Sequence, residues 1–165
     1  MPNTSQIRIY WDSCVWLAYV NGDIPERMPT IDALLKDSAS HNGRIHLVTS
    51  ELALVEVAFG LQEQKGRTLD AAVEANIDKM WEDRDSLSLI EYHSRIGRSA
   101  RSLIREAMTK DWHLRAIDAV HLATAQWLTV TEFHTYDDKL WRFSEIVGFP
   151  VEQPSTMQIG ASGKK

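Results

Sequence analysis

Apolar runs of strand length alternate along the chain with longer segments whose apolar residues recur every three or four positions. The short runs predict strands, and the longer spacing predicts helices. The expected strands cover residues 7–11, 45–49, 87–92, 132–136 and, more weakly, 146–152. The expected helices cover residues 13–20, 30–40, 50–61, 68–81, 94–109, 116–129 and 138–143. Strands that alternate with helices predict an α/β domain whose mostly parallel sheet carries helices on both faces.

Small polar residues stand at several of the expected helix starts, where they can cap the first turn. Ser13, Thr30 and Ser50 are such positions. The helix that starts at Ser50 carries an apolar stripe, which should face the core. That stripe is formed by Leu52, Val55 and Phe59.

Length and composition predict one globular domain. The chain has 165 residues, of which 44% are hydrophobic, enough to bury a core without disulfides. We expect the domain at residues 1–153 and a disordered tail at 154–165, where the residues are small and polar. A single cysteine, Cys14, and the lack of a visible signal peptide or long apolar run favour a cytoplasmic protein. The net charge of −5 disfavours broad binding to nucleic acid but allows a locally basic surface.

Four acidic residues stand beside or inside apolar runs, where an unpaired carboxylate costs several kcal/mol of desolvation. They are Asp12, Glu56, Asp118 and Asp137. Taken singly, the three aspartates have ordinary explanations as a helix cap, a first-turn acid and a turn residue. Glu56 lies on the apolar stripe of its helix, which no such role explains. Because the carboxyl ends of parallel strands share one edge of the sheet, all four can reach one site.

A shared acidic site requires a cation. Two carboxylates about 4 Å apart repel by about 4 kcal/mol at an effective dielectric near 20, so Glu56→Gln is expected to stabilise the metal-free protein. No Lys or Arg recurs beside all four acids. Oxygen ligands without a thiolate or imidazole cluster favour Mg²⁺ or Mn²⁺ over zinc. These ions stabilise phosphoryl charge and generate hydroxide, so phosphodiester hydrolysis is the expected reaction.

The segments around the four acids resemble the motifs of the PIN-domain family of metal-dependent ribonucleases, and within it the VapC-type toxins of toxin–antitoxin pairs. The matching segments are IYWDSCVWLAYV, VTSELALVEV, RAIDAVHLATA and HTYDDKL. The third match is the most specific, and together they cover residues 7 to about 152. The resemblance implies a three-layer α/β/α sandwich that acts as an endoribonuclease on RNA.

By this resemblance, Asp12, Glu56, Asp118 and Asp137 form the catalytic metal site for Mg²⁺ or Mn²⁺. The residues expected beside them are Ser13, Thr135 and Asp138. Of the adjacent pair of aspartates, Asp137 keeps the family's spacing from Thr135 and is preferred as the acid that faces the metal.

The resemblance also implies a homodimer and inhibition by a small antitoxin. We expect the antitoxin to place a basic side chain among the four acids, because a guanidinium fits carboxylates well. We also expect it to contribute an apolar helix to a groove lined by residues 13–20 and 51–61.

Basic and aromatic residues offer further candidates. Four arginines fall on one face of the helix expected at 94–109, where they can bind RNA phosphates or form a solvated face paired with Glu91 or Glu106. These arginines are Arg95, Arg98, Arg101 and Arg105. His121 follows Asp118 by one turn and is interpreted as a hydrogen-bonded core histidine rather than a ligand. Of the tryptophans, Trp11, Trp16 and Trp127 are expected in the core.

Three alternatives compete with the toxin. A housekeeping PIN nuclease would share every motif. A non-catalytic PIN scaffold should lack a motif acid, and none is missing. A receiver-like regulatory domain needs a phosphoacceptor Asp at the end of the middle strand and a Lys near the last strand, but the second strand ends in Thr49 and Ser50.

Overall fold

The computed structural model of the chain describes residues 6–156. A five-stranded sheet forms its centre, with the strand order β3-β2-β1-β4-β5 and parallel pairing throughout. The strands are β1 (Ile7–Trp11), β2 (Ile45–Ser50), β3 (Leu87–Ile90), β4 (Glu132–His134) and β5 (Val151–Glu152). Most of the expected tail, residues 157–165, lies outside the described residues.

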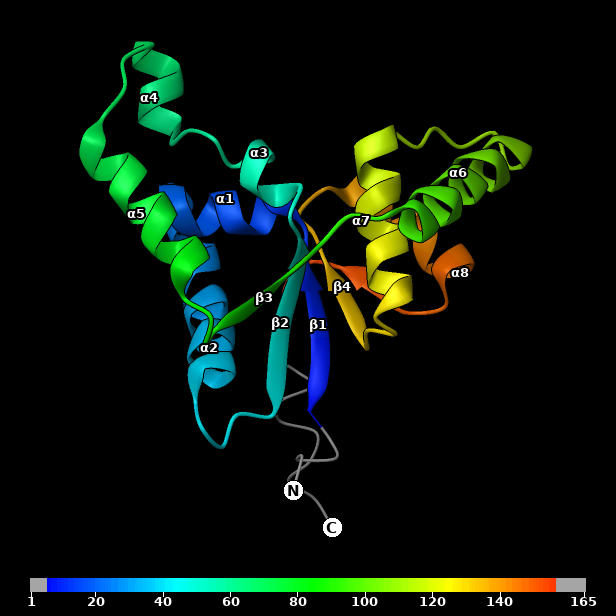
Figure 1. Ribbon diagram of the computed structural model, residues 1–165, viewed down its shortest axis with the longest axis horizontal. Helices are drawn as coiled ribbons and strands as arrows, with labels where there is room; N and C mark the ends of the chain where they lie inside the picture. The colour runs from blue at the N-terminus through cyan, green and yellow to red at the C-terminus, as the bar shows by residue number, and fades with distance from the viewer. Residues whose placement is uncertain (1–5, 157–165) are drawn as a thin grey trace.

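Helices cover both faces of this sheet (Figure 1). One layer contains α1 (Ser13–Asn21), α2 (Met28–Ala39) and α5 (Ala71–Glu82). The other layer contains α6 (Ser94–Thr109), α7 (Ala116–Trp127) and α8 (Ser144–Val147). The strand side chains alternate between the layers: Ile9 and Trp11 belong to the core under α1 and α2, and Tyr10 belongs to the core under α6 and α7. The predicted α/β/α sandwich is therefore confirmed.

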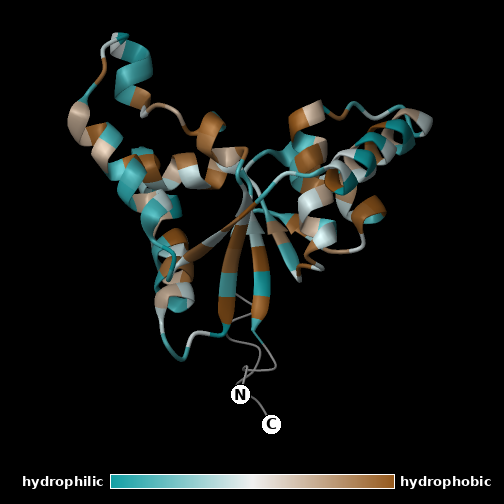
Figure 2. Ribbon diagram, viewed as in Figure 1, coloured by the Kyte–Doolittle hydropathy of each residue, from teal (hydrophilic) through white to brown (hydrophobic). Residues whose placement is uncertain are grey.

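Apolar residues occupy the space between the layers. Figure 2 shows hydrophobic positions in β1 and β2 where these strands run between the helices. Trp11 and Trp16 are fully buried in this interior, as expected. The expectation for Trp127 is wrong, because it lies at the end of α7 and its side chain is 49% exposed.

The helix expected over residues 50–61 is the largest error of the sequence interpretation. Ser50 ends β2, and only one turn, α3 (Ala53–Glu56), precedes α4 (Leu61–Gly66). The backbone is extended at Gly60, whose N–H donates to the Glu63 carboxylate and so starts a new helix. A side chain at Gly60 would also lie 2.7 Å from Val73 Cγ1. The break leaves the expected apolar stripe on the surface, with Val55 75% exposed.

Smaller differences concern helix starts. Asp12, rather than Ser13, caps α1 by accepting the Ser13 N–H. Thr30 does not cap α2, because the short 3₁₀ helix η1 (Pro25–Arg27) leads directly into a helix that begins at Met28. The segment after β4 forms a 3₁₀ helix, η2 (Asp138–Phe143). Among residues 6–156, no helix is both long and apolar enough to cross a membrane.

Candidate functional site

The carboxyl edge of the sheet gathers acidic residues from separate parts of the chain. Asp12 follows β1, Glu56 closes α3 just beyond β2, and Asp118 lies in the first turn of α7. His121, one turn further along α7, contacts Glu56 and lies 3.8 Å from Asp12 through its Nε2 atom. The three acids and His121 therefore form one cluster, named here the acidic site.

Asp12 is the most firmly held of these acids. Its Oδ1 atom accepts the backbone N–H of Ser13 at 2.8 Å and the Ser13 hydroxyl at 3.4 Å. Its Oδ2 atom accepts the Thr135 hydroxyl at 2.9 Å. The parallel pairing of β1 with β4, in which Trp11 lies opposite His134, brings Thr135 to this position. Ser13 and Thr135 thus contact the site as the sequence predicted, while their roles remain predictions.

His121 is fully buried and connects two hydrogen-bond partners. Its Nδ1 atom lies 2.6 Å from the Tyr10 hydroxyl, which also accepts the Ser50 N–H at 2.9 Å. Its Nε2 atom bonds the Glu56 carboxylate. Because a carboxylate only accepts, Nε2 carries a hydrogen whether the ring is neutral or charged. The interpretation of His121 as a hydrogen-bonded buried histidine is confirmed, but the sequence did not indicate that its partner is a site carboxylate.

Asp118 is held by a cation from its own helix. The Arg115 Nε atom donates to Asp118 Oδ2 at 2.7 Å, and an Arg115 terminal nitrogen donates to Oδ1 at 3.2 Å. The Asp118 side chain is 7% exposed and the Arg115 side chain is 63% exposed, so the guanidinium lies on the solvent side of the carboxylate. Sequence reasoning missed Arg115, although its spacing of three residues from Asp118 is a known signal of helical ion pairs.

Asp137 and Asp138 differ in exposure. Asp137 is half-buried, and its N–H donates to the Thr135 hydroxyl that also binds Asp12. Its carboxylate caps η2 by accepting the Lys139 N–H at 3.1 Å, so it also fills the ordinary turn role. Asp138 is exposed. Asp137 is thus the less exposed of the two, while its role as the acid that faces a metal stays a prediction.

Electrostatics differ among the acids. Burial raises the pKa of Glu56, but the hydrogen bond and charge of His121 outweigh it and lower the pKa below its usual value. Burial lowers the pKa of His121, but Glu56 and Asp12 raise it above its usual value. At Asp118, burial outweighs the Arg115 contact and raises the pKa. Burial therefore disfavours the charged form of Asp118, although Arg115 contacts both of its oxygens.

The donors fit a hard divalent cation in their chemistry but are not preassembled around one. Within residues 6–156, no group of three or more His, Cys, Asp or Glu side chains is arranged to hold a metal ion. Arg115 and His121 instead lie against Asp118 and Glu56. Carboxylate oxygens are nevertheless the ligand type that suits Mg²⁺ or Mn²⁺.

Two surfaces lie outside the acidic site. On α6, Arg95, Arg98, Arg101 and Arg105 are exposed, and no ion pair within 4.0 Å joins them to Glu91 or Glu106 in the described part of the chain. Arg95 instead lies 5.8 Å from the ring of the exposed Trp127. Of the two alternatives for this face, local pairs to Glu91 or Glu106 are therefore not seen in the described part of the chain.

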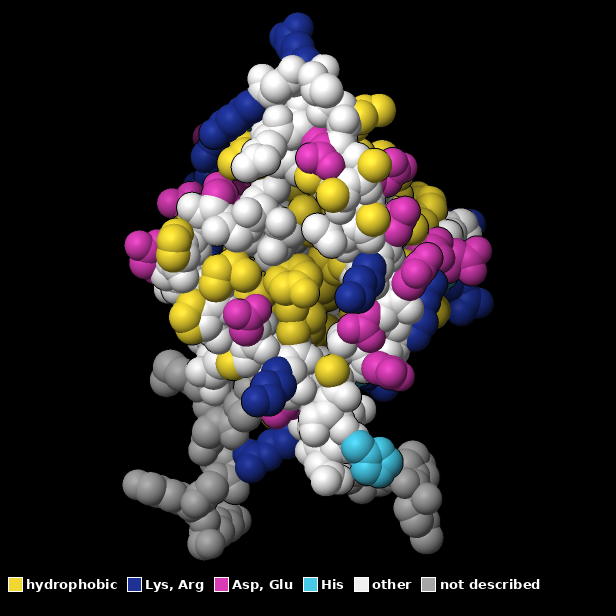
Figure 3. All heavy atoms as spheres, turned by 90° about the vertical axis from the view of Figure 1, so that its left-hand side faces the viewer, with side chains coloured by type: hydrophobic (Ala, Val, Ile, Leu, Met, Phe, Trp, Pro, Cys, Tyr) yellow, Lys and Arg dark blue, Asp and Glu magenta, His cyan; other side chains and the backbone are white. Residues whose placement is uncertain are grey.

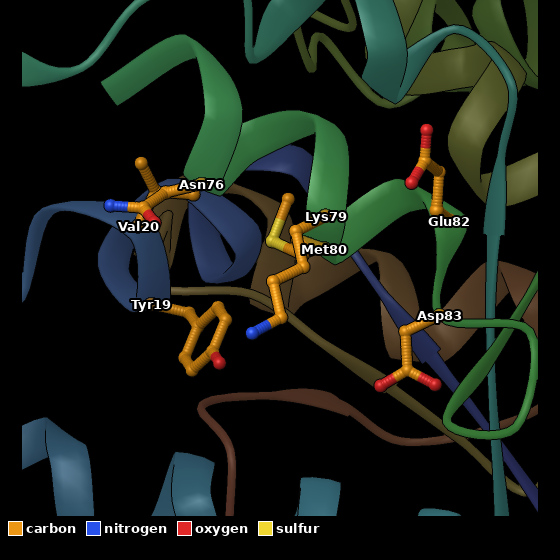
Figure 4. A pocket seen from close by; sticks show the side chains of 7 residues that line it. All are labelled: Tyr19, Val20, Asn76, Lys79, Met80, Glu82 and Asp83. Carbon is orange, nitrogen blue, oxygen red and sulfur yellow. The ribbon is translucent and has the colours of Figure 1, made fainter. Parts of the chain in front are cut away.

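On the opposite layer, hollows lined by both apolar and charged side chains lie beside α5. A hollow of about 620 Å³ lies between α1 and α5, on the face where Figure 3 shows hydrophobic side chains gathered between charged ones. Figure 4 shows Tyr19 and Val20 of α1 across from Met80 and Lys79 of α5. A smaller hollow of about 240 Å³ lies between α5 and the α3 segment, which contributes Leu54. Residues 13–20 and 51–61 were expected to line one groove, but each segment borders its own hollow against α5.

A parallel α/β/α domain with carboxylates at its strand ends defines the class of this protein. Residues 9–146 match the family model of the PIN domain, and the chain belongs to that family. The resemblance drawn from the motifs is confirmed. No curated protein sequence matches the chain.

Solved structures share the fold at low sequence identity. VapBC2 from Rickettsia felis, bound to a DNA fragment from its promoter, matches with a TM-score of 0.65 and 13% identity, over 90% of this chain and 100% of that chain. FitAcB from Neisseria gonorrhoeae matches with a TM-score of 0.61 and 17% identity, over 88% of this chain and 97% of that chain. VapC20 from Mycobacterium tuberculosis, a toxin that cleaves the sarcin–ricin loop, matches with a TM-score of 0.55 and 16% identity, over 79% of this chain and 90% of that chain.

Proposed function

We propose that this protein is a Mg²⁺- or Mn²⁺-dependent endoribonuclease and the toxin of a toxin–antitoxin pair. The observation that carries the proposal is the acidic site, in which Asp12, Glu56 and Asp118 meet at the carboxyl edge of a PIN-domain sheet. Toxins among the structures of similar fold support the biological role. An RNA substrate and an unpaired Cys14 favour action in the cytoplasm.

Each residue of the site has a distinct part in this proposal. Asp12 and Asp118 are the main metal ligands, and Glu56 and Asp137 bind directly or through water. The bound ion supplies a hydroxide nucleophile and neutralises phosphoryl charge. Thr135 fixes the orientation of Asp12, and His121 holds Glu56 toward Asp12 through its Nε2–H. The carboxylates that receive the metal are thereby kept in place by neighbours that need not bind it.

The arginine face of α6 is the proposed RNA surface. Arg95, Arg98, Arg101 and Arg105 are exposed, and no ion pair joins them to the acids of their own helix among the described residues. Unpaired guanidinium groups bind phosphates and release counterions. The chain as a whole carries a net charge of −5, so RNA would be held at this basic surface and repelled by the more acidic remainder.

The hollows beside α5 are the proposed antitoxin surface. An apolar helix fits a groove walled by Tyr19, Val20 and Met80, and the charged Lys79 and Glu82 at the same hollow can set its orientation. A basic side chain from the same partner would enter the acidic site and occupy the position of the metal. The homodimer remains a prediction, which light scattering of the purified protein tests.

The nuclease proposal is tested with the purified full-length chain and a labelled pool of cellular RNA, in Mg²⁺ and in EDTA. Asp12→Asn and Asp118→Asn should each reduce cleavage by orders of magnitude while keeping the circular dichroism spectrum. Asp32→Asn, on the exposed side of α2, is the control and should cleave normally. Cleavage by Asp118→Asn at the wild-type rate would refute the proposal. For the toxin role, induced wild-type protein should arrest bacterial growth and Asp118→Asn should not.

A further inference from the structure

Arg115 occupies the solvent side of the Asp118 carboxylate. It caps the start of α7 with an extended backbone, and its guanidinium spans both Asp118 oxygens at 2.7 and 3.2 Å. Asp118 itself is almost closed to solvent, with 7% of its side chain exposed. A metal ion that approaches Asp118 from solution therefore meets a carboxylate whose two oxygens are already bound.

The exposure of the Arg115 side chain allows its contact with Asp118 to be exchanged for another. The Arg115 side chain is 63% exposed, so it can leave Asp118 without emptying a packed cavity. Water and salt can compete for the exposed guanidinium, although the carboxylate that it binds is nearly buried. In the described part of the chain, no other Lys or Arg forms an ion pair with Asp12, Glu56, Asp118 or Asp137. Among the described residues, Arg115 is thus the Lys or Arg side chain that the protein itself supplies to these acids.

A released Arg115 would still lie beside the reacting phosphate. It is anchored by its backbone at the start of α7, three residues from Asp118, and its charge also interacts with Asp137 and Asp12. A guanidinium fork that fits a carboxylate fits a phosphate with the same geometry. An RNA phosphate drawn to the acidic site by a metal ion would therefore lie within reach of the Arg115 guanidinium and could replace Asp118 as its partner.

We propose that Arg115 exchanges partners during the reaction: it holds Asp118 when no metal is bound, and binds an RNA phosphate once the metal has taken Asp118. The exchange keeps the charge of the buried Asp118 compensated in the metal-free enzyme. It supplies a contact to the substrate only when metal and RNA are bound. This inference rests on the proposed nuclease function and adds a substrate-binding residue that the four acids do not provide.

Two titrations test the exchange. The first measures Mn²⁺ binding to the RNA-free protein by calorimetry. Arg115→Gln should bind Mn²⁺ about tenfold more tightly, because the competitor is gone. Arg115→Lys keeps the charge but not the two-pronged contact, and should also bind more tightly than wild type. Arg84→Gln, exposed before β3 at the other edge of the sheet, is the control and should not change Mn²⁺ affinity.

The second titration measures binding of a fluorescent 20-nucleotide RNA of mixed sequence in Ca²⁺, by anisotropy. Arg115→Gln should bind this RNA about tenfold more weakly, opposite to its effect on Mn²⁺. Unchanged Mn²⁺ affinity in Arg115→Gln, wild-type Mn²⁺ affinity in Arg115→Lys, or unchanged RNA affinity would each overturn the exchange. Asp118→Asn separates this failure from that of the function: if it binds Mn²⁺ as wild type does, the metal site itself is misplaced.

Discussion

The hydrogen bond between Tyr10 and His121 can be measured by a double-mutant cycle in metal-free protein. Both side chains are fully buried, and the Tyr10 hydroxyl bridges the Ser50 N–H and His121 Nδ1. Tyr10→Phe keeps the ring stacked on Phe133 and removes only this bridge. His121→Leu removes the other partner. Each change leaves buried polar atoms unpaired, which costs about 1–3 kcal/mol of unfolding free energy.

The double variant decides whether the two side chains act together. The single variant His121→Leu leaves the Tyr10 hydroxyl without its His121 partner, and Tyr10→Phe leaves the imidazole nitrogen without its Tyr10 partner. The double variant contains neither of these unpaired atoms. The total loss should therefore be about 1–2 kcal/mol smaller than the sum of the single losses. Urea unfolding in EDTA at pH 6 measures all four proteins. Losses that add to within about 0.5 kcal/mol would refute the coupling. Tyr10→Phe combined with Ser38→Ala, at the opposite edge of the sheet, should be additive.

The His121–Glu56 contact should also give stability a pH window. The pKa of Glu56 is lowered from 4.5 in the folded protein, so its contribution is present above pH 4.5 and is lost as pH falls through the lowered value. The pKa of His121 is raised from 6.5, so its contribution is present below pH 6.5 and is lost as pH rises through the raised value. The stability difference between wild type and His121→Gln should therefore peak between pH 4.5 and 6.5. A flat difference from pH 5 to 9 would contradict this.

The same contact reverses an expectation drawn from the sequence. Repulsion among acids predicts that Glu56→Gln stabilises the metal-free protein. Because His121 favours the charged form of Glu56, we now expect Glu56→Gln to lower the melting temperature in EDTA at pH 6.

Three further predictions concern other groups. Burial raises the pKa of Asp118, so Asp118→Asn should raise the melting temperature in EDTA at pH 7. This gain should shrink as the pH falls through the raised pKa. Saturating Mn²⁺ should raise the melting temperature of the wild type and not that of this variant. Burial raises the pKa of Cys14 to about 12, so roughly one thiol in ten thousand is ionised at pH 8 and a disulfide reagent should react far more slowly than in urea. Replacing Arg98, Arg101 and Arg105 with Gln should reduce the salt slope of RNA binding by about 2, and an unchanged slope would assign these arginines to a solvated surface.

The sheet and the place of Asp12 could be predicted because they depend on local sequence alone. A mainly apolar run such as residues 7–11 has few alternatives to a buried parallel strand, and the residue that follows it must lie at the carboxyl edge. Asp12 therefore has its place fixed by β1, and its N–H donates to the His134 carbonyl of β4. Asp137 lies three residues beyond β4, and its choice over the exposed Asp138 as the acid that faces a metal stays a prediction.

What the sequence could not provide depends on contacts between distant segments. The apolar stripe with Val55 and Phe59 predicted a continuous helix, but the helix ends at Glu56 and a new one begins after Gly60, which leaves no room for a side chain beside Val73. No residue near position 60 indicates that Gly60 will lie beside Val73, because Val73 belongs to a different helix. His121 and Glu56 are 65 positions apart, so their pairing depends on how α3 and α7 meet at the end of the sheet.

The acids of the site differ in how they are held, and this difference determines where the geometry of the site can vary. Asp12 is fixed by hydrogen bonds from Ser13 and Thr135, and Asp118 lies on a long helix that packs against α6. Glu56 lies on a single helical turn on which Leu54 and Val55 are exposed. Ala53 and Val57 pack that segment into the core, and His121 is the hydrogen-bond partner of the Glu56 carboxylate. Because one turn of helix has little stability of its own, the position of Glu56 depends on these contacts. The α3 turn also borders the hollow against α5, so whatever packs there acts on the segment that carries Glu56.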